Sequence, residues 1–227
     1  MIHIGPLDIA AFVWLLACMI GYPLITRRGL LAGRGLSTAI QRQRVQWIKS
    51  MSERENRIID IQLLANLANG NAFFASTSVI VIGGLAAVLG ASAEWQVMLS
   101  KLPYAAESSP LLWKLKTLFL MALFVMAFFK FAWAFRLTHY TAIMIGSTPE
   151  ISEGTAAACR DHAERTARLA GIAAEHANAG LRAYYFAIAG IAWYLHPVLL
   201  MLSVTYVVLV LYRREYRSRA LRAIRGS

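Results

Sequence analysis

The sequence of 227 residues is poor in charge. Asp, Glu, Lys and Arg make up only 15% of the chain, whereas hydrophobic residues make up 58%. A soluble domain of this size keeps about a quarter of its residues charged, so the composition excludes that class. Since the uncharged residues are also gathered into long blocks, the sequence predicts a membrane protein.

Cysteine and catalytic motifs are scarce as well. The two cysteines are Cys18, inside the first apolar block, and Cys159, in a polar segment. Such a pair predicts neither a disulfide framework nor a zinc cluster. The sequence contains no Gly-x-Ser-x-Gly turn, no His-Glu-x-x-His pair and no Gly-x-x-x-x-Gly-Lys phosphate loop. We therefore predict that the protein is not an enzyme.

The histidines do not form a recognisable cofactor site. Cys159 and His162 have i,i+3 spacing, and His176 lies about four turns further along the same predicted helix. A bis-histidine haem needs two histidines that face each other at one depth, and only His3 and His196 meet that condition. Nothing else in the sequence marks a pocket there, so we expect no metal and no cofactor.

Long apolar blocks are what the sequence has in abundance. Each contains at most one charged residue, and they cover residues 6–25, 72–89, 118–135 and 183–211. A bilayer core about 30 Å thick needs roughly 20 residues of helix to cross it. The first block has no preceding Lys or Arg and no small-x-small cleavage site, so we expect it to be retained. The predicted fold is an all-α integral membrane helix bundle, a single membrane domain over residues 1–227.

The net charge of +11 is confined to two segments. Residues 26–57 contain eight Lys/Arg against two Glu, and residues 212–227 contain six Arg against one Glu. Since Lys and Arg beside spans stay on the cytoplasmic side, we expect both segments there and the protein in the bacterial inner (plasma) membrane. The arginine-rich tail predicts contact with anionic lipid headgroups rather than with nucleic acid.

Two polar segments predict long cytoplasmic helices, over residues 38–60 and 155–182. The first has no Gly or Pro from Leu36 to Asn69 and has capping-box spacing from Thr38 to Gln41. We expect a helix to begin there and to run unbroken into the second apolar block. It could lie on the membrane surface with Trp47 at headgroup level, or it could pack on its own bundle.

The second polar helix carries both small and ionisable residues. Small residues at intervals of four or three let another helix approach closely, and here they are Ala163, Ala167, Gly171 and Ala174. Further along, Glu175, Asn178 and Arg182 share one helix face. Arg182 could stabilise an anion, pair with Glu175, or snorkel at the membrane boundary.

The last apolar block is interrupted by His196 and Pro197. The chain could turn there, or a single kinked helix could cross the membrane once. Residues 183–195 alone make about 20 Å of helix, short of a span, so the preceding polar helix could complete that arm. Only a turn places both basic segments on one side, so charge parity favours the turn.

Two further groups are candidates for a pathway or for helix contacts. Gln62, Asn66 and Asn69 fall on one stripe with Phe73 and Ser76. That stripe could line an aqueous vestibule, or it could form hydrogen bonds between helices. Lys130 and Arg136 share a face of the third block, as a cation ring or as snorkelling anchors.

Several stretches together carry a family resemblance. They are "RVQWIKSM", "ANGNAFFASTS", "AFFKFAWAFR", "HYTAIMIGSTP", "NAGLRAYYF", "AWYLHP" and "VLYRREY". The combination resembles a bacterial and plant family of multi-pass membrane proteins catalogued only as a domain of unknown function. The resemblance covers essentially the full chain. It implies an integral membrane protein, usually described with four spans, and implies no catalytic residue, cofactor or substrate.

These features lead to two functional expectations. The polar stripe and the Arg182 cluster favour a homo-oligomeric channel or passive transporter. The absence of any catalytic or ligand motif favours instead an accessory or scaffold subunit of a larger membrane complex. The expected partners are the lipid bilayer, anionic headgroups and further copies of the chain.

Overall fold

A computed structural model describes residues 5–28, 33–54, 56–100, 109–149 and 155–226. Every regular element in these residues is a helix, which confirms the predicted all-α class. The elements are α1 (Pro6–Arg28), α2 (Leu36–Ser52), α3 (Ile58–Gly90), α4 (Ser92–Ser100), α5 (Pro110–Gly146), α6 (Ala156–Gly190), the 3₁₀ turn η1 (Ile191–Tyr194), α7 (Pro197–Tyr216) and α8 (Arg219–Arg225).

Four stretches within the described residues are long and apolar enough to cross a membrane. They are Pro6–Thr26, Ile58–Gly90, Pro110–Gly146 and Pro197–Arg225. The second and third extend well beyond the predicted apolar blocks 72–89 and 118–135, because polar turns continue the same helices. The prediction of a membrane helix bundle is therefore confirmed.

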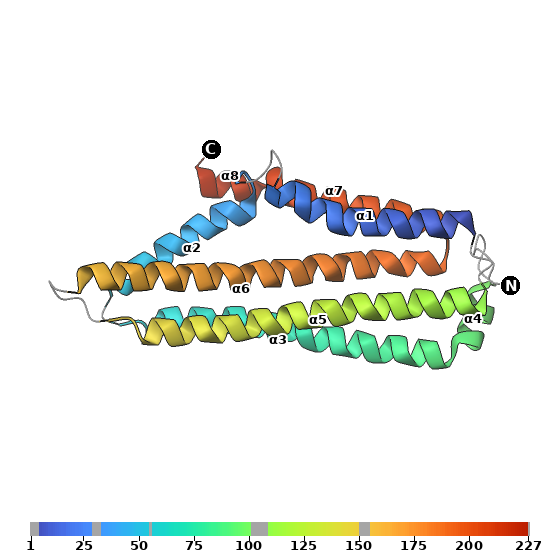
Figure 1. The fold of residues 1–227 in the computed structure, drawn as a ribbon, viewed down its shortest axis with the longest axis horizontal. Helices are drawn as coiled ribbons and strands as arrows, with labels where there is room; N and C mark the ends of the chain where they lie inside the picture. Colours follow the sequence, from blue (N-terminus) through green and yellow to red (C-terminus); the bar gives the residue numbers. More distant parts are fainter. Residues whose placement is uncertain (1–4, 29–32, 55, 101–108, 150–154, 227) are drawn as a thin grey trace.

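The helices lie roughly parallel to one long axis, with α6 in the middle of the view (Figure 1). The pair α1 and α7 lies on one side of α6, and α5 and then α3 lie on the other. The N-termini of α1, α5 and α7 meet η1 at one end, here called the aromatic end. The other end, where α2 and α8 lie, is here called the basic end.

The chain turns at His196 and Pro197. The predicted polar helix and the first arm of the last apolar block form one helix, α6, which ends at Gly190 before η1. His196 caps α7 by accepting a hydrogen bond from the Val198 N–H on Nδ1, at 3.1 Å. Pro197 follows at the first helical position, where its missing N–H costs no hydrogen bond. Helix α7 then returns along α6 (Figure 1), so the kinked single span is excluded.

The small-residue stripe of α6 receives α2, as its spacing predicts. Ala163 and Ala167 are buried in one cluster with Ile48 and Met51 of α2. A Cβ added to Gly171 would lie 2.6 Å from Nε2 of Gln41, so a larger residue there would displace that side chain. Helix α2 therefore packs on its own bundle, which decides between the two alternatives left open by the sequence.

The predicted unbroken helix over residues 38–60 is wrong. Helix α2 begins at Leu36 after Gly35 rather than at Thr38, and it ends at Ser52. Gln41 does not close a capping box, since its Nε2 donates to the carbonyl of Ala167 at 3.3 Å. No Gly or Pro marks the break, and its cause lies in tertiary contacts of the corner that follows.

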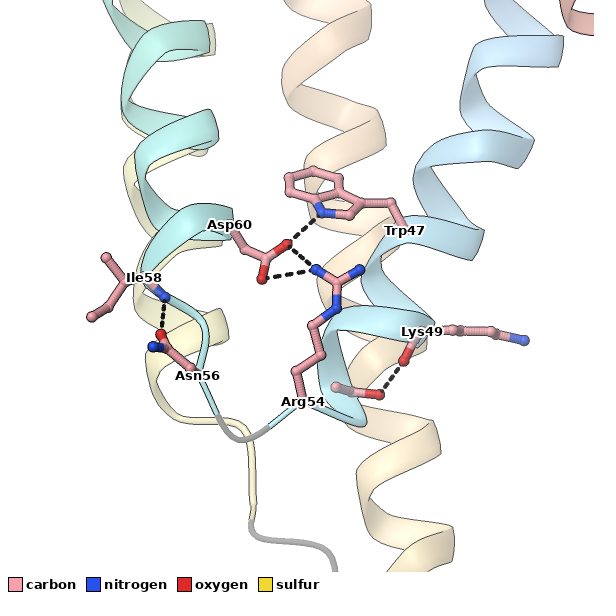
Figure 2. A network of polar contacts seen from close by, with 7 residues as sticks. Trp47, Lys49, Arg54, Asn56, Ile58 and Asp60 are labelled. Carbon is pink, nitrogen blue, oxygen red and sulfur yellow. Dashed lines mark hydrogen bonds and ion pairs between the residues drawn. The ribbon is translucent and has the colours of Figure 1, made fainter.

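That corner is built around Asp60, which is 2% exposed (Figure 2). Trp47 donates from Nε1 to Oδ1 of Asp60 at 2.7 Å, and Arg54 donates from Nη1 to the same oxygen at 3.0 Å. In a continuous helix, Trp47 and Asp60 would be separated by about 20 Å along the axis. The break brings them together, and it also lets Asn56 accept from the N–H of Ile58 at 3.0 Å.

Candidate functional site

A partly enclosed cavity of about 820 Å³ lies at the basic end, bounded by α1, α2, α3, α5, α6 and α7. Its charged and amide side chains include Arg44, Glu175, Asn178, Arg182, Arg214 and Glu215. A cavity of this size with several polar side chains is typical of a small-molecule binding site.

The start of α2 is anchored on α7, and this anchoring roofs the cavity. Glu215 of α7 accepts from the Ser37 N–H at 2.9 Å and from the Ser37 hydroxyl at 3.0 Å. A carboxylate at a helix N-terminus also meets the positive end of the helix dipole. A Cβ on Gly35 would lie 2.2 Å from Oε1 of Glu215, so only glycine leaves room for this contact.

A second side chain, Arg44, reaches the cavity from α2. Its guanidinium donates from Nη1 to Oε1 of Gln41, which in turn is held by the Ala167 carbonyl. Burial lowers the pKa of Arg44. The group nevertheless stays cationic near neutral pH, because arginine is effectively always protonated in proteins. Helix α2 therefore places a fixed positive charge over the cavity.

Helix α6 contributes all three of its predicted site residues. Glu175, Asn178 and Arg182 line the cavity together, as their spacing on one face indicates. Leu211 and Arg214 of α7 line the same cavity. Since the apolar run of α7 ends at Leu211, Arg182 lies at the level where that helix leaves the apolar layer.

The predicted stripe on α3 lies elsewhere. Gln62, Asn66 and Asn69 are exposed, because α3 buries the opposite face through Asp60, Leu64, Ala68, Ala75 and Ser78. These three residues do not line the cavity, and a contact with another chain stays a prediction for them. The α3 amide that does line it is Asn71, seven residues after Leu64 and therefore on the buried face.

The predicted pair on α5 also lies outside the cavity. Lys130 is half-buried, and Arg136 is exposed. Arg136 donates from Nη2 to the Tyr140 hydroxyl at 3.0 Å, and its guanidinium lies 5.7 Å from the centre of that ring. Such an arrangement is typical of an arginine that snorkels beside an aromatic residue at a membrane boundary.

An ion pair at the aromatic end was not predicted. Nζ of Lys116 lies 2.9 Å from Oδ1 of Asp8, and the two side chains are 1% and 11% exposed. Trp193 donates from Nε1 to the same carboxylate oxygen at 2.8 Å, while Nζ of Lys116 donates to the Trp193 carbonyl at 3.2 Å. The available signal was that Asp8 is the sole charge in its apolar block, since such a charge needs a partner.

Aromatic rings surround this ion pair. The ring of Phe12 lies 5.0 Å from that of Phe119 and 5.7 Å from that of Trp193. On the other side, the rings of Trp113 and Tyr194 are 4.4 Å apart. Helices α1 and α5 and the turn η1 are thus joined at the aromatic end by packed rings and by one charged contact.

The candidate metal and haem residues have other contacts. His162 shares a hydrogen bond from Nε2 with the Met144 carbonyl at 2.7 Å, and Sγ of Cys159 donates to the Pro149 carbonyl at 3.5 Å. His196 caps α7, whereas His3 lies outside the described residues. Across the part of the chain that the structure describes, no group of three or more His, Cys, Asp or Glu side chains is placed to hold a metal ion.

Comparison with known proteins identifies a family. A family model described as "Protein of unknown function, DUF599" matches residues 10–220 of the chain. No curated protein matches the sequence, and no solved structure matches it. The match covers all the helices except the beginning of α1 and most of α8.

Proposed function

The chain belongs to this family of proteins of unknown function, and we propose that it is a passive transporter for a small anionic solute. The basic-end cavity is the proposed binding site, and it is the observation that carries the proposal. Its volume of about 820 Å³ lies in the range of small-molecule sites, roughly 300–1,000 Å³.

The charge of the cavity favours an anion. Its described lining includes three arginines, Arg44, Arg182 and Arg214, and two glutamates. One of these, Glu215, is already occupied by the N–H and hydroxyl of Ser37. A guanidinium presents paired N–H donors that match a carboxylate or phosphate, so the proposed solutes belong to these classes.

The difference between the two ends supports a transporter more than an open pore. The cavity is hollow at the basic end, while the ion pair of Lys116 with Asp8 and the rings around it close the aromatic end. A solute bound in the cavity therefore needs a conformational change to cross. In this proposal the structure corresponds to a state open toward the basic end.

The proposed orientation follows from the charge of the two basic segments. In this proposal α6 crosses the membrane as well as the four apolar stretches. Four crossings, by α3, α5, α6 and α7, then lie between residues 26–57 and residues 212–227, so the two basic segments fall on the same side. Lys and Arg beside spans are retained in the cytoplasm, so the basic end faces the cytoplasm of a bacterial inner membrane. The cavity then receives solute from inside the cell.

The test is solute flux into liposomes that contain the purified protein. The variant Arg182→Ala removes a cavity cation, and Arg168→Ala removes an exposed arginine from the same helix as a matched control. We expect wild type and the control to pass small carboxylates or phosphate, and Arg182→Ala to lose most of that flux. Equal flux in all three, or none in folded wild type, would refute the proposal.

A second candidate function rests on the outer face of α3. Ile59 and Leu63 are 77% and 48% exposed there, near the end of α3 at the Asp60 corner. These first turns of α3 precede the apolar block 72–89, and exposed apolar residues beside such a block favour contact with protein, either another copy of the chain or a larger membrane complex. Co-purification in mild detergent tests this accessory role: a large partner would support it, and a homo-oligomer alone would support self-association.

A further inference from the structure

We propose that the groove between the end of α7 and α8 binds the phosphate group of an anionic phospholipid. The groove has a volume of about 600 Å³ and contains five arginines, Arg213, Arg214, Arg217, Arg219 and Arg222. The groove shares Arg214 with the basic-end cavity, but its other four arginines lie outside that cavity, and binding a lipid there goes beyond the function proposed above.

The groove has no acidic side chain in its described lining. Five like charges in one groove repel each other, and an anion bound among them relieves that repulsion. The ion pairs formed between described residues include none of these arginines. The arrangement therefore favours a bound anion that carries at least one full negative charge.

The one acid in this part of the sequence is committed to another helix. Glu215 of α7 binds the N–H and hydroxyl of Ser37 at the start of α2. Arg225, the sixth arginine of the tail, donates to the Arg34 carbonyl at 2.6 Å. The first contact joins α7 to α2, and the second joins α8 to the segment before α2. Among the described residues, no carboxylate forms an ion pair with the five groove arginines.

The groove is held in shape by its own helix. The Ser218 hydroxyl accepts from the Leu221 N–H at 3.1 Å and so caps α8, while the Leu221 side chain is buried at 4% exposure. At the cavity side, Arg214 donates to the Tyr185 hydroxyl at 3.3 Å. The angle between α7 and α8 is therefore fixed before any ligand binds, which lowers the entropic cost of binding.

The position of the groove points to a lipid rather than to a free solute. It follows Leu211, where the apolar run of α7 ends, and the same stretch of α7 carries Tyr212 and Tyr216, whose rings lie 5.2 Å apart. Tyrosines gather at the headgroup level of a bilayer. A phosphodiester of a neighbouring lipid lies at that level, and the planar guanidinium fork matches it.

The test is the binding of short-chain phosphatidylglycerol to the full chain in neutral detergent, beside phosphatidylcholine and inorganic phosphate. The variant Arg217→Gln/Arg219→Gln/Arg222→Gln removes three groove charges. The control Arg42→Gln/Arg160→Gln/Arg168→Gln removes three exposed arginines elsewhere. We expect phosphatidylglycerol to bind the groove variant roughly 30- to 100-fold more weakly than wild type, and the control to bind within about threefold of wild type.

A lysine variant keeps the test decisive if the glutamine variant fails to fold. Arg217→Lys/Arg219→Lys/Arg222→Lys keeps the charge and loses the fork, so we expect binding weaker than wild type by a factor of about 3–10. Equal loss in the groove variant and the control, or equal binding of phosphatidylcholine, would overturn the proposal. Competition by inorganic phosphate with no preference for the lipid would overturn the lipid as ligand.

Discussion

The two ends of the molecule handle charge in opposite ways. At the aromatic end, one cation and one anion are buried together, with Lys116 1% exposed and its Nζ 2.9 Å from Asp8. At the basic end, arginines and glutamates are spread around a cavity of about 820 Å³. A charge in an apolar layer must be paired, whereas a charge beside a cavity that water can enter need not be paired. The first arrangement fixes helices, and the second leaves room for a ligand.

The comparison extends to how α1 and α7 are held against the rest of the bundle. At the aromatic end, rings and the ion pair join α1 directly to α5 and η1. At the basic end, α2 lies between the two groups, anchored to α7 by Glu215 and to α6 through Gln41. Separating α1 and α7 from the rest of the bundle therefore breaks direct ring and ion-pair contacts at the aromatic end, but contacts made through α2 at the basic end.

The largest effect is expected from the aromatic-end ion pair. Asp8→Asn keeps an acceptor for Trp193 but removes the negative charge that lies 2.9 Å from the buried ammonium of Lys116, so we expect the free energy of unfolding to fall by about 3 kcal/mol. Asp8→Asn combined with Lys116→Met removes both charges, and we expect it to recover most of that loss. Unfolding in detergent measures both; a double variant as unstable as the single one would contradict this account.

A smaller loss is expected at the Asp60 corner. Asp60→Ala leaves the Trp47 N–H without an acceptor and Arg54 without an ion pair, so we expect a loss of about 2 kcal/mol. Arg54 is half exposed, so solvent screens its part of the interaction. The matched control is Asp161→Ala, whose carboxylate is 62% exposed beside Arg165 and should contribute under about 0.5 kcal/mol. Thermal unfolding of the two variants would test the ranking.

Substitution of Gly35, at the roof of the cavity, should cost less stability than the Asp60 substitution, and the loss should depend on whether Glu215 is present. Gly35→Ala places a Cβ against the Glu215 carboxylate, so we expect a loss of about 1–2 kcal/mol. Glu215→Ala removes the obstacle along with the hydrogen bonds to Ser37, so the two substitutions should cost less together than their separate losses combined. Unfolding of both single variants and the double variant measures the coupling, and strict additivity would show that the two residues do not meet.

Much of the fold was predictable because it depends on local patterns. Apolar length predicted the spans, the small residues of α6 predicted a close helix, and charge parity favoured the turn at His196 and Pro197. The break between α2 and α3 was not predictable in this way. No Gly or Pro stands there, and the contacts that stabilise it join Asp60 to Trp47 across the corner.

The candidate site was predictable only in part, for a related reason. Glu175, Asn178 and Arg182 are close in sequence on one amphipathic helix, so their shared face could be read directly. Asp8 and Lys116 pair across more than a hundred residues, and no local pattern joins them. Helix α3 is apolar nearly all round, so its periodicity does not tell which of its amides faces inward.

The smallest expected effect concerns those amides. Asn66 and Asn71 are five residues apart, which places them about 140° apart around α3. Asn71→Leu removes a polar group from the cavity, so we expect solute flux to fall two- to tenfold, the effect of about one lost hydrogen bond. Asn66→Leu changes an exposed position, so flux should be unchanged and stability should stay within about 0.5 kcal/mol. If Asn66→Leu instead reduced flux, the outer stripe of α3 would belong to a pathway formed between chains, and the basic-end cavity would lose its place as the route.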